Sequence, residues 1–196
     1  MRKGWVLVVM AFALCGCVHT RTMDFAVPAP ELRTTAAWGN SVGVGVSVSD
    51  KRIDRTTLGK ALVNNGATYI VQPRQGLEEA LTQGIKTELQ TRGVRLADGP
   101  AFLLVDISKA DSITRISAFN IDVAANAEMA VQVLGADGRN YFQQTYRRYE
   151  AGKGEIWTMD TVEQGTFRLE KIMAELIREM IEDDRLAQAL VAASRG

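Results

Sequence analysis

The residues best suited to catalysis lie close together at the amino terminus of the 196-residue chain. Its two cysteines are Cys15 and Cys17, and its one histidine is His19. Because the rest of the sequence has neither a thiol nor an imidazole, Ser-His-Asp and Cys-His catalysis are excluded there. A zinc site would have to use carboxylates alone, which is unusual for that ion. We therefore expect no metal and no cofactor.

The first residues have the order of a secretory signal. Arg2 and Lys3 supply the charged start, an unbroken apolar run covers residues 5–14, and small residues follow. This run is too short for a transmembrane helix, which needs about 20 apolar residues. The sequence therefore predicts that residues 1–16 are a signal peptide.

The end of this signal resembles a bacterial lipobox, Leu14-Cys15-Gly16-Cys17, in which a Leu and two small residues precede an obligatory Cys. The resemblance implies that Cys17 carries acyl chains such as palmitate, which anchor the protein permanently when two or more are present. By the sorting rule of enterobacterial lipoproteins, Val18 in place of Asp favours the periplasmic face of the outer membrane. The alternatives are an ordinary secretory signal followed by an incidental cysteine, or a redox pair of the two cysteines.

Composition indicates a compact protein, with 46% hydrophobic and 23% charged residues. The formal net charge is zero, so no overall field exists to attract nucleic acid, and we expect no nucleic-acid partner. Residues 17–40 contain Pro28 and Pro30 without apolar periodicity, which predicts a lipidated Cys followed by an extended linker. Residues 41–196 are then a single periplasmic domain.

Hydrophobic periodicity predicts the elements of that domain. Alternation predicts strands over residues 41–50, 68–72, 101–108, 121–133 and 141–150, with an irregular stretch near Asp111. Apolar stripes predict one helix over residues 75–92, a second that ends near residue 181, and a short last helix. These elements favour an α+β fold: a two-layer sandwich whose mainly antiparallel sheet of about four strands has two long amphipathic helices on one face.

Polar residues crowd the end of the first predicted strand, at Asp50, Arg52 and Asp54. They form either a recognition site for a partner or glycan, or a salt-bridged turn that orders the next loop.

A second candidate surface combines aromatic and basic residues on or after the last predicted strand. It includes Tyr146, Arg148 and Trp157, and such a composition is enriched at binding surfaces. Strand alternation alone would turn half of the aromatic rings toward the core, so a structural role is the alternative.

Several of these features together resemble the YajG-like family of small outer-membrane lipoproteins. The similarity covers the lipobox, the proline-containing linker, the valine-rich strand that enters Asp50-Lys51-Arg52-Ile53-Asp54, the helix end TELQTRGVRL and the turn at Gly138. Asp50, Arg52 and Asp54 match an Asp-x-Arg-x-Asp stretch of that family, whereas Ile53 stands where the family often has Pro. The resemblance implies a lipid-anchored α+β domain and brings no catalytic residues.

These observations predict a non-enzymatic, periplasm-facing lipoprotein that binds an envelope protein or glycan as an accessory module. One alternative is an envelope enzyme that acts on peptidoglycan or polysaccharide through a carboxylate pair, drawn from Asp106, Asp111 and Glu155. A second alternative is a carrier of a small ligand or lipid, which would need an apolar cavity.

Overall fold

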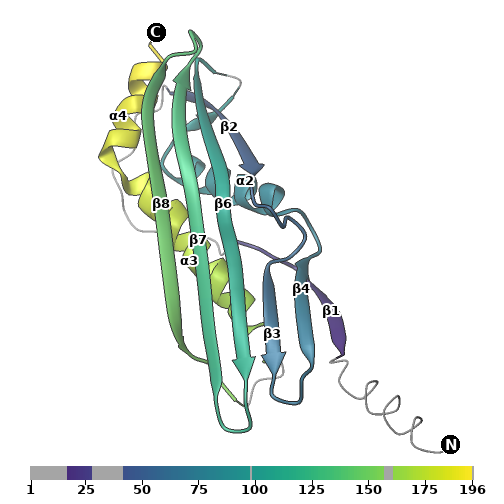
Figure 1. Cartoon of the computed structure of the whole chain (residues 1–196). Helices are drawn as coiled ribbons and strands as arrows, with labels where there is room; N and C mark the ends of the chain where they lie inside the picture. The colour runs from purple at the N-terminus through teal and green to yellow at the C-terminus, as the bar shows by residue number, and fades with distance from the viewer. Residues whose placement is uncertain (1–16, 28–41, 98, 157–160, 196) are drawn as a thin grey trace, which may run out of the picture.

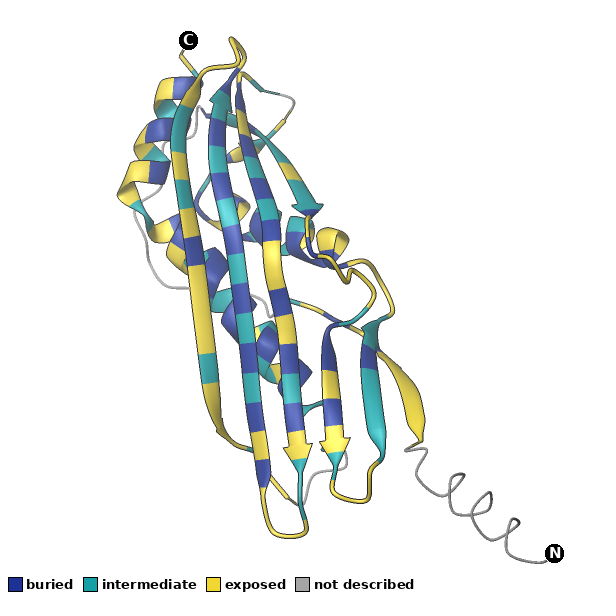
Figure 2. Ribbon diagram, viewed as in Figure 1, coloured by how far each residue is buried: buried dark blue, intermediate teal, exposed yellow. Residues whose placement is uncertain are grey.

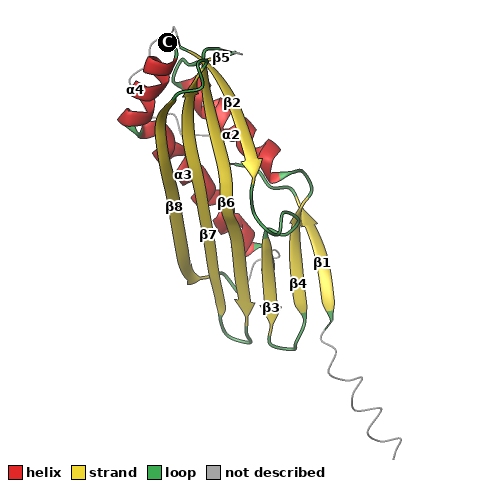
Figure 3. Cartoon of the chain, turned by 45° about the horizontal axis from the view of Figure 1, so that its top comes forward, coloured by secondary structure: helices red, strands yellow, loops and turns green. Residues whose placement is uncertain are grey.

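A computed structural model describes residues 17–27, 42–97, 99–156 and 161–195, which form one mixed sheet with helices over one face (Figures 1 and 3). The eight described strands are β1 (Val18–Met23), β2 (Gly43–Asp50), β3 (Gly59–Val63), β4 (Thr68–Pro73), β5 (Arg95–Leu96), β6 (Ala101–Ile116), β7 (Ile121–Gly135) and β8 (Asn140–Lys153). The three described helices are α2 (Leu77–Thr91), α3 (Gln164–Glu182) and α4 (Asp184–Ala193).

The long strand β6 organises the sheet. β7 pairs with one edge of β6 in antiparallel fashion, and β8 continues the sheet beyond β7. The other edge of β6 is shared, because β2 runs parallel to residues 101–107 and β3 runs parallel to residues 112–116. β4 and β1 extend the sheet from β3, and β5 extends it from β2.

The core lies between the sheet and the helices. Along β7, buried residues from Ile121 to Val133 alternate with partly exposed residues such as Asn126 and Gln132 (Figure 2). α3 covers this inner face with fully buried residues on one stripe, among them Met173 and Met180. The period of two in the strand and of 3.6 in the helix both turn apolar side chains toward this interface.

The α+β class predicted from sequence is confirmed, but the sheet is larger and more mixed than expected. It has eight described strands instead of about four, and four of its strand pairs are parallel and three antiparallel. Three helices are described, and the third, α4, is the short last helix that the apolar stripes predicted. β5 contains only two residues, which are too few for alternation to be recognised.

Strand β6 also continues where the sequence predicted an irregular stretch. It runs through Asp111 to Ile116 with a register shift between Ile107 and Lys109. The shift is that of a β-bulge, which accommodates one extra residue and bends the strand without ending it.

The prediction that residues 17–40 form a linker is wrong for their first part. Val18–Met23 is strand β1, paired in parallel with β4, and Phe25 is fully buried in the core. Backbone pairing and the burial of Phe25 and Met23 hold this segment on the domain. Leu32 and Trp38, two large apolar residues of the predicted linker, lie outside the described residues.

A buried ion pair closes the gap on the β6 edge between the end of β2 and the start of β3. The Arg52 guanidinium contacts Asp50 at 2.8 Å, and both residues are less than a tenth exposed. Arg52 Nη1 also donates to the carbonyl oxygens of Ala110 on β6 and of Thr57, each at 2.8 Å. The backbone N–H of Asp50 donates to Glu78 Oε1 in the first turn of α2 at 2.6 Å. Of the two interpretations of this cluster, the geometry favours the salt-bridged turn.

Arg52→Ala should lower the free energy of unfolding by about 3–5 kcal/mol, because it leaves the Asp50 carboxylate buried without its counter-charge. Chemical denaturation of the purified domain measures this change. Arg55→Ala, an exposed arginine in the same loop, is the matched control and should lower stability by less than about 0.5 kcal/mol. Equal midpoints for the two variants would show that the pair does not support the sheet.

Candidate functional site

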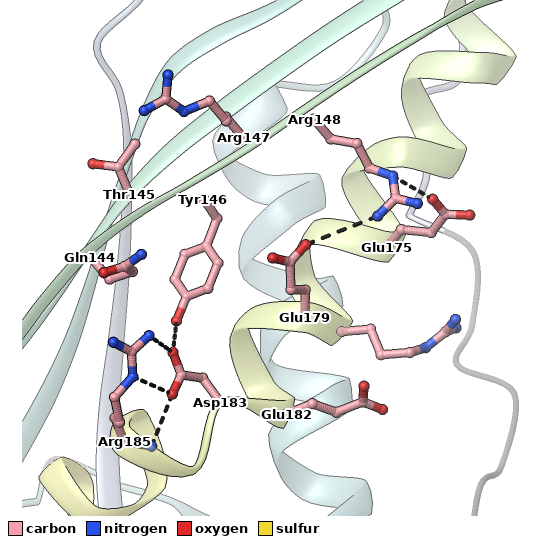
Figure 4. Close-up of a pocket in the computed structure, with 11 residues that line it drawn as sticks. Gln144, Thr145, Tyr146, Arg147, Arg148, Glu175, Glu179, Glu182, Asp183 and Arg185 are labelled. Atoms are coloured by element: carbon pink, nitrogen blue, oxygen red, sulfur yellow. Dashed lines mark hydrogen bonds and ion pairs between the residues drawn. The ribbon is translucent and has the colours of Figure 1, made fainter.

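A polar groove of about 800 Å³ lies between β8 and the pair of helices α3 and α4 (Figure 4). Five consecutive residues of β8, Gln144–Arg148, line one wall. Neighbouring strand residues point to opposite faces, so a wall of five in a row follows the edge of the strand. The other wall consists of charged residues from the two helices: Glu175, Arg178, Glu179, Glu182, Asp183 and Arg185.

The helical wall follows from the amphipathic sequence of α3. Its four groove residues, Glu175, Arg178, Glu179 and Glu182, are spaced three and four apart and therefore share one face of the helix. The apolar stripe of the same helix packs on the sheet. Burial of that stripe turns the charged face toward β8.

Tyr146 connects the two walls at the junction of the helices. Its ring is buried, and its hydroxyl donates to Asp183 Oδ2 at 2.9 Å. Asp183 is the N-cap of α4 and accepts from the backbone N–H of Arg185 at 2.9 Å and from its guanidinium at 2.7 Å. The Arg185 contacts, aided by the bond from Tyr146, lower the pKa of Asp183 to about 2. Burial and the Asp183 carboxylate raise the pKa of Tyr146, which keeps the phenol protonated as the donor.

Arg148 is the basic residue of β8 that pairs across the groove with α3. Its Nε lies 2.8 Å from Glu175 Oε2, and its Nη1 lies 4.0 Å from Glu179 Oε2. The side chain remains 44% exposed, so it is held in place yet open to a ligand. The groove thus offers positioned charges of both signs, which suit a partner with many hydrogen-bonding groups.

The structure separates the two clusters predicted from sequence. Tyr146 and Arg148 lie in the groove, whereas Trp157 lies outside the described residues. Asp50 and Arg52 are buried at the gap on the β6 edge. Asp54 is exposed in the following loop, where hydrogen bonds from Thr56 and Thr57 lower its pKa to about 2.

The three carboxylates considered for catalysis do not form a pair. Asp106 and Asp111 are five residues apart along β6, which places them roughly 16 Å apart at strand rise. Glycosidases hold their two carboxyl groups about 5–10 Å apart. Glu155 follows β8 and lines a separate hollow beside the start of α3. Within the described residues, no group of three or more His, Cys, Asp or Glu side chains is arranged to hold a metal ion.

Sequence reasoning missed the acidic and basic residues of α3. Glu175, Arg178, Glu179 and Glu182 recur at helical spacing between the apolar positions, and this pattern was visible. However, a charged helix face usually points to solvent, and only the position of β8 makes this face one wall of a groove.

Residues 29–191 match the model of a protein family described as "Uncharacterized lipoprotein". The chain belongs to this family. The resemblance to the YajG-like lipoproteins is thereby confirmed, and membership indicates a membrane-anchored envelope protein. No curated protein matches the chain. No helix in the described part of the lipoprotein is long and apolar enough to cross a bilayer.

Solved structures are similar to this chain at low sequence identity. Protein XCC0632 from Xanthomonas campestris is similar with a TM-score of 0.56 and 13% identity, over 89% of this chain and 98% of that one. A minor lipoprotein from Acinetobacter baumannii matches with a TM-score of 0.43 and 9% identity, over 74% of this chain and 94% of that one. The first similarity supports the fold of the lipoprotein and carries no function.

Asp183→Asn should lower the free energy of unfolding by about 1–2 kcal/mol at pH 7, because two charge-assisted hydrogen bonds weaken. The pKa of Asp183 is about 2 in the folded protein, below its ordinary value of 3.8, so its contribution is complete above about pH 5 and is lost progressively as the pH falls through about 2. Denaturation at pH 7, 4 and 3 should therefore show the difference between parent and variant shrinking.

The matched control is Asp184→Asn, the next carboxylate along the chain, which should give a small difference at every pH. A stability gap for Asp183→Asn that stayed constant between pH 7 and pH 3 would contradict the assigned hydrogen bonds.

Proposed function

We propose that this lipoprotein is anchored by acylated Cys17 to the periplasmic face of the outer membrane, where it binds another envelope protein as a non-enzymatic accessory module. The groove beside β8 receives an extended segment of that protein. The observation that carries the proposal is the combination of an open strand edge with positioned charges in one groove.

The strand edge favours a polypeptide over a glycan. Among the described strands, β8 pairs with β7 alone, so its outer edge offers backbone N–H and C=O groups along Gln144–Arg148. An extended peptide can add a strand to such an edge, and its side chains then give specificity. Arg148 and Glu179 are placed to contact charged side chains of that peptide.

The anchor is supported by the lipobox and by the family match. Cys17 is exposed directly before β1, so its thiol is accessible to carry acyl chains. Val18 after the cysteine supports the outer membrane as the destination.

Cys17→Ser should abolish incorporation of a fatty-acid label in cells and release the protein from the membrane fraction, because the thiol that accepts the lipid is gone. Cys15→Ser is the matched control and should be labelled as the parent is, since Cys15 leaves with the signal. An unlabelled parent, or membrane retention of Cys17→Ser, would contradict the proposed anchor.

A photo-crosslinking amino acid at Thr145 should capture an envelope protein in intact cells, because Thr145 is exposed on the groove edge of β8. The same amino acid at Ser47, exposed on β2 away from the groove, is the control position. Arg148→Ala should reduce the capture at Thr145 several-fold, whereas Arg115→Ala, an exposed arginine on β6, should leave it unchanged.

Equal capture from Thr145 and Ser47, or no effect of Arg148→Ala, would contradict binding in the groove. Turnover of purified peptidoglycan that was lost in Asp106→Asn or Asp111→Asn would contradict the non-enzymatic part of the proposal.

A further inference from the structure

One end of the sheet is defined by a row of mutually paired residues that crosses from β1 to β8. The row consists of Val18, Thr68, Leu62, Arg115, Asp122 and Lys153. Cys17 lies one residue beyond this row, and its carbonyl oxygen accepts from the backbone N–H of Thr68 at 3.0 Å. The β6–β7 turn, residues 117–120, extends beyond the row at the same end, as the lower end of Figure 1 shows. We call this region, with the row, Cys17, the turns and the residues that follow β8, the anchor end.

Exposed apolar side chains gather at the anchor end. Of the eight exposed large hydrophobic residues in the described chain, four lie there: Val18, Leu62, Phe119 and Ile156. Phe119 is 84% exposed at the tip of the β6–β7 turn. Single exposed apolar residues are normal on any surface, but their concentration at one end marks a surface with an apolar partner.

We propose that the anchor end docks directly on the lipid bilayer, with Phe119 inserted at the boundary between headgroups and acyl chains. The inference rests on the acylation of Cys17 in the proposed function. Because β1 starts at the residue after Cys17, no spacer separates the lipid from the sheet. At about 3.3 Å per strand residue, Cys17 extends about 3 Å beyond the row, and the tip of the turn extends further, to roughly 10 Å. Apolar side chains at a membrane interface are buried about 5–10 Å into the boundary between headgroups and acyl chains, a depth that the tip of the turn can reach.

Charge does not drive this docking. Lys153 pairs with Asp122 at 2.7 Å. The positive charge of exposed Arg115 is balanced in number by the negative charge of exposed Glu155. The anchor end is therefore nearly neutral. Insertion through apolar side chains should occur on zwitterionic lipid and should be insensitive to salt.

The test uses the full acylated protein reconstituted in zwitterionic phosphatidylcholine vesicles, with the environment-sensitive fluorophore NBD on a single introduced cysteine. Phe119→Cys places the probe at the anchor end, and Ala136→Cys places it on the β7–β8 turn at the opposite end as the matched control. Both positions are exposed, so neither label should disturb folding, and circular dichroism verifies this.

The probe at Phe119→Cys should emit at shorter wavelength on vesicles and lose emission when nitroxide-labelled lipid is included, at low and high salt alike. The probe at Ala136→Cys should remain water-like. If the protein floats with the vesicles but both probes emit as they do in water, the docking is overturned and the anchor remains intact. A shift at residue 119 without nitroxide quenching would overturn it in favour of contact with a second copy or another protein. Failure of the protein to float with vesicles would overturn the anchor and the docking together.

Discussion

The fold depends on one edge of β6 being shared by two strands that are not continuous with each other. β2 pairs with the first half of that edge and β3 with the second, and between them a short stretch of β6 has no strand partner on this edge. Arg52 satisfies a carbonyl of this stretch and is itself neutralised by Asp50. Without this filled gap, the β3–β4–β1 part of the sheet would join the remainder along only five residues of β6.

This shared edge places two surfaces on different sides of the molecule. The β3–β4–β1 part extends the sheet to Cys17, so the residue proposed to carry the lipid is continuous with ordered structure. On the other side of β6, β7 carries β8 outward, where its free edge and the charged face of α3 enclose the groove. A rigid connection between these surfaces would hold the groove at a fixed orientation above the membrane, instead of on a mobile tether.

The sequence was informative wherever an element is long and has one polar side. The alternation along β7, the stripe of α3 and the aromatic and basic residues of β8 led to the class of the fold and to Tyr146 and Arg148. The sequence was uninformative where the structure of a segment depends on a partner that is distant along the chain. β1 has no clear alternation and is recognised only by its pairing with β4, and the charged face of α3 becomes a groove wall only because β8 lies opposite. Arg52 was visible as a polar residue, but its burial follows from the gap on β6.

The continuity of β1 with the sheet is the central claim, because it connects the membrane anchor to the fold. Hydrogen–deuterium exchange of the acylated, vesicle-bound protein tests it at the amides of Val18–Met23. The account predicts that these amides exchange as slowly as those of β4, with which they pair. Exchange at the rate of an unstructured chain, while β4 remained protected, would contradict it and would restore a flexible tether between lipid and domain.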